Sequence, residues 1–100
     1  MFIAILDIAT TADDRSAALA VLDAHRPEVR AMKGNLAYHV YASRDDDARI
    51  TILHEWDDEA SFRTYPASDS FARVGAVLQP LMAGAPVSRR FDARPLDAAN

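Results

Sequence analysis

The order of strand-like and helix-like stretches constrains this chain most, because few folds can accommodate it. Short apolar or alternating runs, typical of strands, occupy residues 2–8, 35–44, 49–56 and 86–94. Hydrophobic residues at helical spacing fill the two longer intervals, 11–33 and 57–83. The order is therefore β-α-β-β-α-β. With right-handed crossovers it gives an α+β ferredoxin-like split sandwich, a four-stranded antiparallel sheet with helices on one face.

Prolines and one glycine mark where the helices should break or end. Pro27 lies inside the first helical stretch and should kink or divide it, because proline lacks an amide proton and clashes one turn back. Gly34 ends that stretch as a left-handed cap. Pro66 stops a short helix, and Pro80 should bend the longer helix that Ser68 caps. The second helix is therefore expected in two pieces.

The bulk composition is that of one ordinary globular domain. One hundred residues, half of them hydrophobic, can bury a single core, so we predict one domain over 1–95 and a flexible tail over 96–100. The absence of cysteine excludes disulfides, thiolate metal sites and cysteine nucleophiles. No apolar run approaches the roughly 20 residues that span a bilayer, and no signal-type segment precedes the first strand. We expect no membrane partner and a cytoplasmic location.

The charged residues argue against a nucleic-acid partner. The net charge is −4, and the basic side chains are scattered rather than gathered in a stripe that could follow phosphates. An RNA-recognition domain shares the predicted order of elements, but it needs a basic surface beside exposed aromatic residues on its central strands. The three glycines are too dispersed for a phosphate or dinucleotide loop.

Both faces of the predicted sheet carry apolar or aromatic side chains. Tyr38 and Tyr41 fall on opposite faces of one strand, and Ile52 and Leu53 do so on the next. Helices can cover only one face of such a sheet. An exposed apolar face favours a partner, so we expect a homodimer packed sheet to sheet.

Histidines are the first candidates for chemistry. His39 and His54 lie on adjacent strands, and the hairpin register decides whether they share a face, since a slip of one residue turns every side chain over. If they converge with Glu55 or Asp7, a metal or acid–base site is possible; otherwise they are half-buried residues bonded to backbone or to a dimer partner. Two histidines without a third ligand are a weak metal signal, so no metal is predicted. His25 is interpreted as a surface or boundary residue.

Aromatic and arginine side chains are the second group. Trp56 ends a strand, where its indole could stack on a flat ligand or fill the core. The Tyr65 phenol could bond a substrate oxygen or carry a proton, or it could lie at the boundary with its hydroxyl in water. Arg89 and Arg90 point to opposite faces of the last strand, so one could bind an anionic oxygen, and an inter-subunit salt bridge is the alternative.

Residues 32–92 resemble the antibiotic biosynthesis monooxygenase family. The similarity rests on the hairpin, on the "E-W-x-D-E-A" step from strand to helix at 55–60, and on "S-x-S-F" at 68–71 and "L-x-P-L" at 78–81. The resemblance implies a small dimeric α+β barrel and a cofactor-independent oxygenase of quinol-like or polyketide-like aromatics. The deprotonated substrate would itself supply the electrons to dioxygen. Trp56 and Glu55 match the family's tryptophan and its acidic neighbour.

Two departures from the family pattern affect the expected chemistry. Many members carry a histidine near the end of the short helix, where this chain has Tyr65, and a tyrosine acts as a base near neutral pH only if its pKa is strongly lowered. The haem-degrading branch uses side chains at positions that correspond to Leu6, Tyr65 and Gly75 here. None of these can replace the axial histidine, so haem is not expected and no cofactor is predicted.

The sequence therefore favours a cofactor-independent monooxygenase of a small aromatic substrate. The alternative is a homodimer of the same fold that binds a small molecule without catalysis, or that is purely structural. We expect Trp56, Tyr65 and one of the two strand histidines to line a cavity between sheet and helices. The candidate catalytic residues are His39, His54 and Tyr65, and the candidate substrate-binding residues are Trp56, Tyr38 and Arg89.

Overall fold

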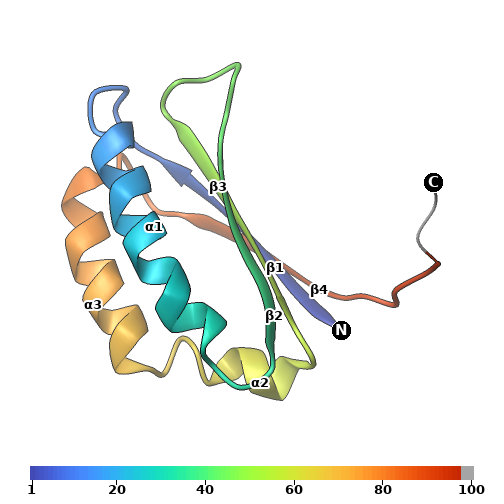
Figure 1. Ribbon diagram of the computed structural model, residues 1–100. Helices are drawn as coiled ribbons and strands as arrows, with labels where there is room; N and C mark the ends of the chain where they lie inside the picture. The colour runs from blue at the N-terminus through green and yellow to red at the C-terminus, as the bar shows by residue number, and fades with distance from the viewer. Residues whose placement is uncertain (98–100) are drawn as a thin grey trace.

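The predicted order of elements is confirmed in the computed structural model, which describes residues 1–97 (Figure 1). The elements are β1 (Phe2–Ala9), α1 (Arg15–Arg30), β2 (Asn35–Ala42), β3 (Arg49–Trp56), α2 (Glu59–Arg63), α3 (Asp69–Leu78), the 3₁₀ turn η1 (Gln79–Leu81) and β4 (Val87–Asp92). The strands form one antiparallel sheet in the order β2-β3-β1-β4. The helices lie on one face, as the ferredoxin-like prediction requires. Residues 98–100 of the predicted tail lie outside the described part of the chain.

Local side-chain bonds fix where the two shorter helices begin. Ser68 caps α3 as predicted, and its hydroxyl accepts a hydrogen bond from the Phe71 amide at 3.1 Å. Asp58 caps α2 in the same way, accepting from the Ser61 amide at 2.7 Å. Gly34 has φ of 85°, the left-handed conformation expected of the residue that ends the loop after α1.

Pro27 does not divide α1, so of the two predicted effects, a kink or a division, the division is wrong. The helix continues to Arg30, three residues past the proline whose amide proton is missing. Leu22 and Val29, on either side of the proline, are fully buried beneath the helix, and their packing outweighs one lost backbone bond. Pro80 does change its helix, because α3 ends at Leu78 and the chain tightens into η1.

The core lies between the sheet and the helices. Alternate residues of β1 and β3 point into it, and Ile8, Ile50 and Trp56 are among the most deeply buried side chains of the described residues. From α1 and α3, Val29 and Leu78 pack against this face. No helix within residues 1–97 is both long enough and apolar enough to cross a membrane.

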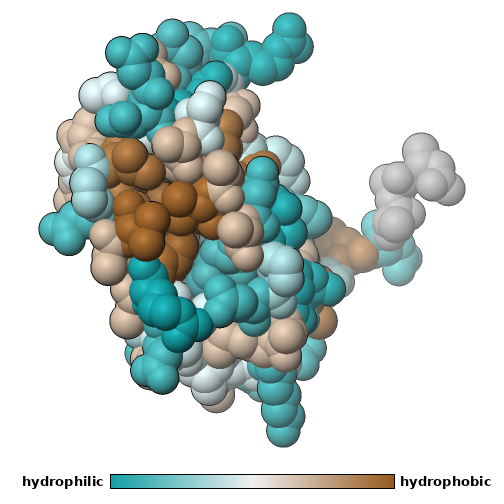
Figure 2. All heavy atoms as spheres, turned by 60° about the vertical axis from the view of Figure 1, so that its left-hand side comes forward, coloured by the Kyte–Doolittle hydropathy of each residue, from teal (hydrophilic) through white to brown (hydrophobic). Residues whose placement is uncertain are grey.

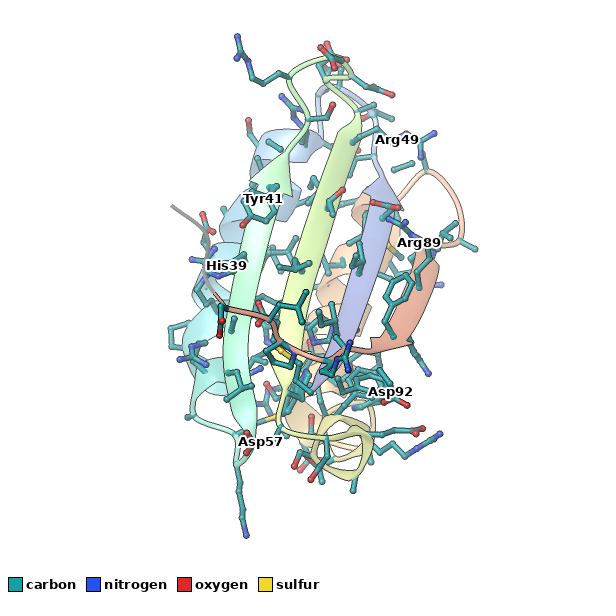
Figure 3. The ribbon with its side chains drawn as sticks, turned by 90° about the vertical axis from the view of Figure 1, so that its right-hand side faces the viewer. His39, Tyr41, Arg49, Asp57, Arg89 and Asp92 are labelled. Atoms are coloured by element: carbon teal, nitrogen blue, oxygen red, sulfur yellow. The ribbon has the colours of Figure 1, made fainter. Side chains whose placement is uncertain are left out.

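The opposite face of the sheet, which we call the open face, carries no helix. Ile3, Ile5 and Leu53 lie half-buried at its centre, and Tyr41 and Phe91 are exposed toward its two edges. Figure 3 looks onto this face and shows Tyr41 on β2. The chain beyond β4 leaves from this side and projects away from the body of the domain (Figure 1).

Candidate active site

A cavity of about 320 Å³ lies between the sheet, α2 and α3. Its walls are mainly apolar and aromatic, with Leu6 and Ile52 from the sheet and Val74 from α3. Seen from the helix side, hydrophobic side chains gather in one patch on the molecular surface (Figure 2). The few polar side chains that reach the cavity are Tyr38, His54, Tyr65, Ser88 and Arg90. An apolar enclosure of this size with few polar groups is typical of a site for a small organic ligand.

The strand register brings two of these polar side chains to the same face. Ala4 on β1 pairs with His54 on β3 and also with Arg90 on β4. The two side chains therefore stand on either side of a methyl group, about 10 Å apart at the backbone, since neighbouring strands are about 4.8 Å apart. The guanidinium of Arg90 lies 4.9 Å from the centroid of the Phe62 ring, and this cation–π contact holds it at the cavity.

His54 is a neutral hydrogen-bond donor at this site. The indole N–H of Trp56 donates to Nδ1 of His54 at 2.9 Å, and an indole can only donate. The proton of the neutral imidazole is therefore on Nε2. Burial, and secondly the positive charge of Arg90, lower the pKa of His54 to about 4. With its one lone pair occupied by Trp56, His54 cannot act as a base toward a bound molecule.

Tyr65 and His25 form a buried pair beside the cavity. The Tyr65 hydroxyl lies 2.7 Å from Nε2 of His25, which is only 3% exposed. This corrects the interpretation of His25 as a surface or boundary residue. Burial raises the pKa of Tyr38 to about 12 and raises that of Tyr65 well above its usual range. Neither phenol is ionised near neutral pH, so Tyr65 is no tyrosinate base.

The structure separates the predicted site residues into two groups. Tyr38, His54 and Tyr65 line the cavity. Trp56 does not line it: the indole is completely buried behind Tyr65, with ring centroids 6.0 Å apart. Trp56 thus fills the core and orients His54.

His39 and Arg89 lie on the open face (Figure 3). His39 pairs with Leu53 in the hairpin, one residue out of phase with Tyr38 and His54, so its side chain points away from the helices. The Arg89 guanidinium lies 3.5 Å from the Asp7 carboxylate, an ion pair within the chain rather than a contact to the cavity. Neither side chain is near the polar groups of the cavity.

Sequence reasoning missed His25 and chose the wrong member of the arginine pair for the cavity. His25 falls at the spacing of Ala18, Leu22 and Val29, the buried stripe of α1, and that spacing was the available signal. For Arg90 the sequence offered no such signal, because the pairing of β4 with β1 determines which residues of β4 face the cavity. Within the described residues, no group of three or more histidine, aspartate or glutamate side chains is placed to hold a metal ion.

The fold and the cavity define a class of small α+β domain with an aromatic-walled cavity between its sheet and its helices. The sequence profile of the antibiotic biosynthesis monooxygenase family matches residues 1–76. The chain belongs to that family, which confirms the resemblance seen in its motifs.

Solved structures of low sequence identity share the whole fold. A candidate antibiotic biosynthesis monooxygenase from Deinococcus radiodurans is 17% identical, covers 100% of this chain and 99% of its own, and has a TM-score of 0.91. The protein Rv0793 from Mycobacterium tuberculosis is 23% identical over 99% of this chain and 98% of its own, with a TM-score of 0.83. An antibiotic biosynthesis monooxygenase is 19% identical over 95% of this chain and 100% of its own, with a TM-score of 0.85. Comparison with curated proteins gives no significant match.

Proposed function

We propose that this protein is a cofactor-independent monooxygenase that oxidises a small hydroxylated aromatic bound as its phenolate. One observation carries the proposal: the apolar cavity holds a cation, Arg90, and a neutral N–H donor, His54, on the same face of the sheet. A phenolate offers an aromatic body to the apolar walls and one anionic oxygen to these donors. Family membership supports the reaction class.

The proposed reaction follows from holding the substrate as an anion. Charge-assisted hydrogen bonds in a site of low dielectric lower the pKa of a bound phenol, and the phenolate is a far better reductant than the phenol. With an anthrone, the anion transfers one electron to dioxygen, and the carbon radical and superoxide combine into a hydroperoxide after a proton returns. Loss of water then leaves a carbonyl. One oxygen atom enters the substrate and the other leaves as water with both methylene hydrogens.

Five side chains take roles in this scheme. Arg90 neutralises the phenolate, and His54 donates its Nε2 proton to the same oxygen. Tyr38 and Tyr65 lie in the aromatic wall, and the protonated hydroxyl of Tyr38 provides a further donor. Trp56 acts through His54, since its bond to Nδ1 keeps the imidazole in the donating tautomer.

We also propose that two copies of the chain associate through the open face. Its centre is apolar, it carries no helix, and the segment after β4 projects from it with Leu96 81% exposed. A second copy would cover the face in a two-fold arrangement.

Oxygen uptake by purified, metal-stripped protein with a panel of hydroquinones and anthrones tests the oxygenase proposal. Arg90→Gln should lower kcat/KM by about tenfold, because a charge-assisted hydrogen bond contributes about 1.5 kcal/mol where its cation remains exposed to water, as Arg90 does. Arg89→Gln is the matched control, one residue along the strand and on the other face, and should leave uptake within about twofold of the wild type. Equal losses in the two variants would contradict the assignment.

The same panel separates catalysis from simple binding. Hydroquinones and anthrones that bind without uptake above the spontaneous rate would favour the alternative, a small-molecule-binding homodimer of this fold. The His54→Met variant has no strong donor, and its sulfur is a weak acceptor for Trp56. Paired with His39→Met as its control, it shows whether uptake depends on the donor in the cavity or on the histidine of the open face.

A further inference from the structure

A chain of polar contacts leads from the cavity to the surface along α1. The Tyr65 hydroxyl lies 2.7 Å from Nε2 of His25. On its other side, Nδ1 of His25 lies 3.6 Å from Oε2 of Glu28 and 3.5 Å from the Ser70 hydroxyl. Glu28 is half exposed and is bonded at 2.8 Å by Arg73 of α3. The contacts thus pass from a cavity wall, through a buried imidazole, to a carboxylate in water.

The partners of His25 determine its tautomer. The bond to Arg73 is the largest of the effects that lower the pKa of Glu28, so this carboxylate is ionised at neutral pH and can only accept. We assign the proton of neutral His25 to Nδ1, the ring nitrogen nearest this carboxylate, which leaves the lone pair of Nε2 toward the hydroxyl of Tyr65. A phenol, an imidazole and a carboxylate in this order have the arrangement by which a histidine draws a proton from a hydroxyl group.

We infer that Tyr65, His25 and Glu28 form a proton outlet, through which the acidic proton of a phenol bound in the cavity passes to His25. This inference rests on the proposed function. It supplies the base that the site otherwise lacks, since the lone pair of His54 is occupied.

The transfer is balanced without a free tyrosinate. The O–H bond of the bound phenol breaks as its proton moves to the Tyr65 oxygen, and the original Tyr65 proton moves to Nε2 of His25 in the same event. The negative charge stays on the phenolate beside Arg90. The positive charge appears on the imidazolium beside Glu28. Tyr65, whose pKa is raised by burial, only passes the proton on.

Fluorescence of 2-naphthol, bound to the protein without oxidation, tests this outlet. Excitation makes this naphthol strongly acidic, so it emits as naphtholate where a proton acceptor is connected to it and as neutral naphthol where none is. Excited beyond the absorption of Trp56, the wild-type complex should emit as naphtholate. Emission should change to the neutral form in Tyr65→Phe and in His25→Gln, while fluorescence anisotropy shows that the probe still binds.

His25→Gln distinguishes proton acceptance from a structural role. The glutamine oxygen can still accept the hydrogen bond of Tyr65, but it has no basic lone pair at neutral pH. If His25 merely positions Tyr65, this variant should keep the naphtholate emission, and that result would overturn the inference. His39→Gln is the control histidine outside the cavity and should emit like the wild type.

The pH dependence gives a second readout. Naphtholate emission should disappear with falling pH as His25 becomes protonated, with a midpoint below 6.5, because burial lowers the pKa of His25. The groups facing His25 are Glu28 of α1, Arg73 of α3, Tyr38 of β2 and Tyr65. Glu28→Gln should move the midpoint to still lower pH, since Glu28 raises the pKa of His25.

Failure of the outlet and failure of the proposed function look different. A wild-type complex that binds 2-naphthol but emits only as the neutral form overturns the outlet and leaves the phenol site standing. No rise in anisotropy with the wild type shows that phenols do not enter the cavity, which overturns both.

Discussion

At the scale of single residues, the chemistry of a side chain depends on the face of the sheet or helix from which it projects and on its hydrogen-bond partners. Arg89 and Arg90 are adjacent and identical, yet one pairs with Asp7 on the open face and the other lies at the cavity. His54 and His25 are both buried, yet Trp56 leaves His54 a donor, whereas His25 has the Glu28 carboxylate 3.6 Å away and is the acceptor in the proposed outlet. In the proposed reaction, His25 would take the proton of the bound phenol and His54 would bond the phenolate.

Because His54 is neutral in the folded protein, the free energy of unfolding should fall as the pH is lowered. Its pKa is about 4 in the folded chain and about 6.5 when unfolded, so the unfolded state binds more protons as pH falls below 6.5. The contribution of His54 to the free energy of unfolding is complete above pH 6.5 and declines toward pH 4. It should lose about 2 kcal/mol between pH 7 and pH 5.

Urea denaturation of the wild type and of His54→Gln at the two pH values measures this loss. The glutamine does not titrate and can still accept the Trp56 bond, so the wild type should lose about 2 kcal/mol more than the variant. Carboxylates and His25 titrate in both proteins and cancel in the difference. Equal losses would mean that His54 is not held neutral by the fold.

At the scale of elements, the sequence predicts whether each segment is a helix or a strand. It predicts less well the face to which the side chains of a strand point. Hydrophobic period and the Ser68 cap were enough for the order of helices and strands. They were not enough to predict which alternate residues of β2 face the helices. Tyr38 and Tyr41 give both faces of the strand an aromatic residue, and a register shift between Asn35 and Ala37 changes the pairing. Which histidine faces the cavity therefore follows from tertiary pairing, and local pattern could not supply it.

Gly75 on α3 offers a test at this scale, because it lines the cavity while remaining exposed. A methyl group added there would meet no atom within 4 Å. Gly75→Ala should therefore raise the free energy of unfolding by about 0.5–1 kcal/mol through helix propensity alone. Thermal or urea denaturation measures the change, and a loss of stability would show that the helix needs glycine at this position.

A larger side chain at Gly75 should instead obstruct the site. Gly75→Leu should weaken binding of 2-naphthol at least about tenfold, because the side chain extends into space that a ligand would use. Ala72→Leu, also exposed on α3 but away from the cavity, is the matched control and should bind like the wild type. Equal affinities in the two variants would place the ligand elsewhere.

At the scale of the whole molecule, the two faces of the sheet have different tasks. The helix face encloses a cavity whose polar groups come from β2, β3, β4 and the segment after α2. The open face is apolar at its centre and exposes Phe91 and Val87 on β4. In a dimer, side chains of the open face would be buried between the two copies and would stabilise the sheet. The same sheet positions His54 and Arg90 on its other face.

The association of two copies has a direct test in the oligomeric state. Wild-type protein should be a dimer by light scattering at concentrations on the order of micromolar, because a single copy leaves Tyr41, Val87 and Phe91 of the open face exposed to water. Leu53→Arg places a charge at the centre of the open face and should give a folded monomer, since burying an unpaired charge is costly. Val77→Arg, at an exposed position of α3 on the helix side, should remain dimeric. A monomeric wild type, or a Leu53→Arg protein that stays dimeric, would show that the copies do not meet through this face. Ile5 and Leu53 would then remain partly exposed to water, because only one side of the sheet is covered.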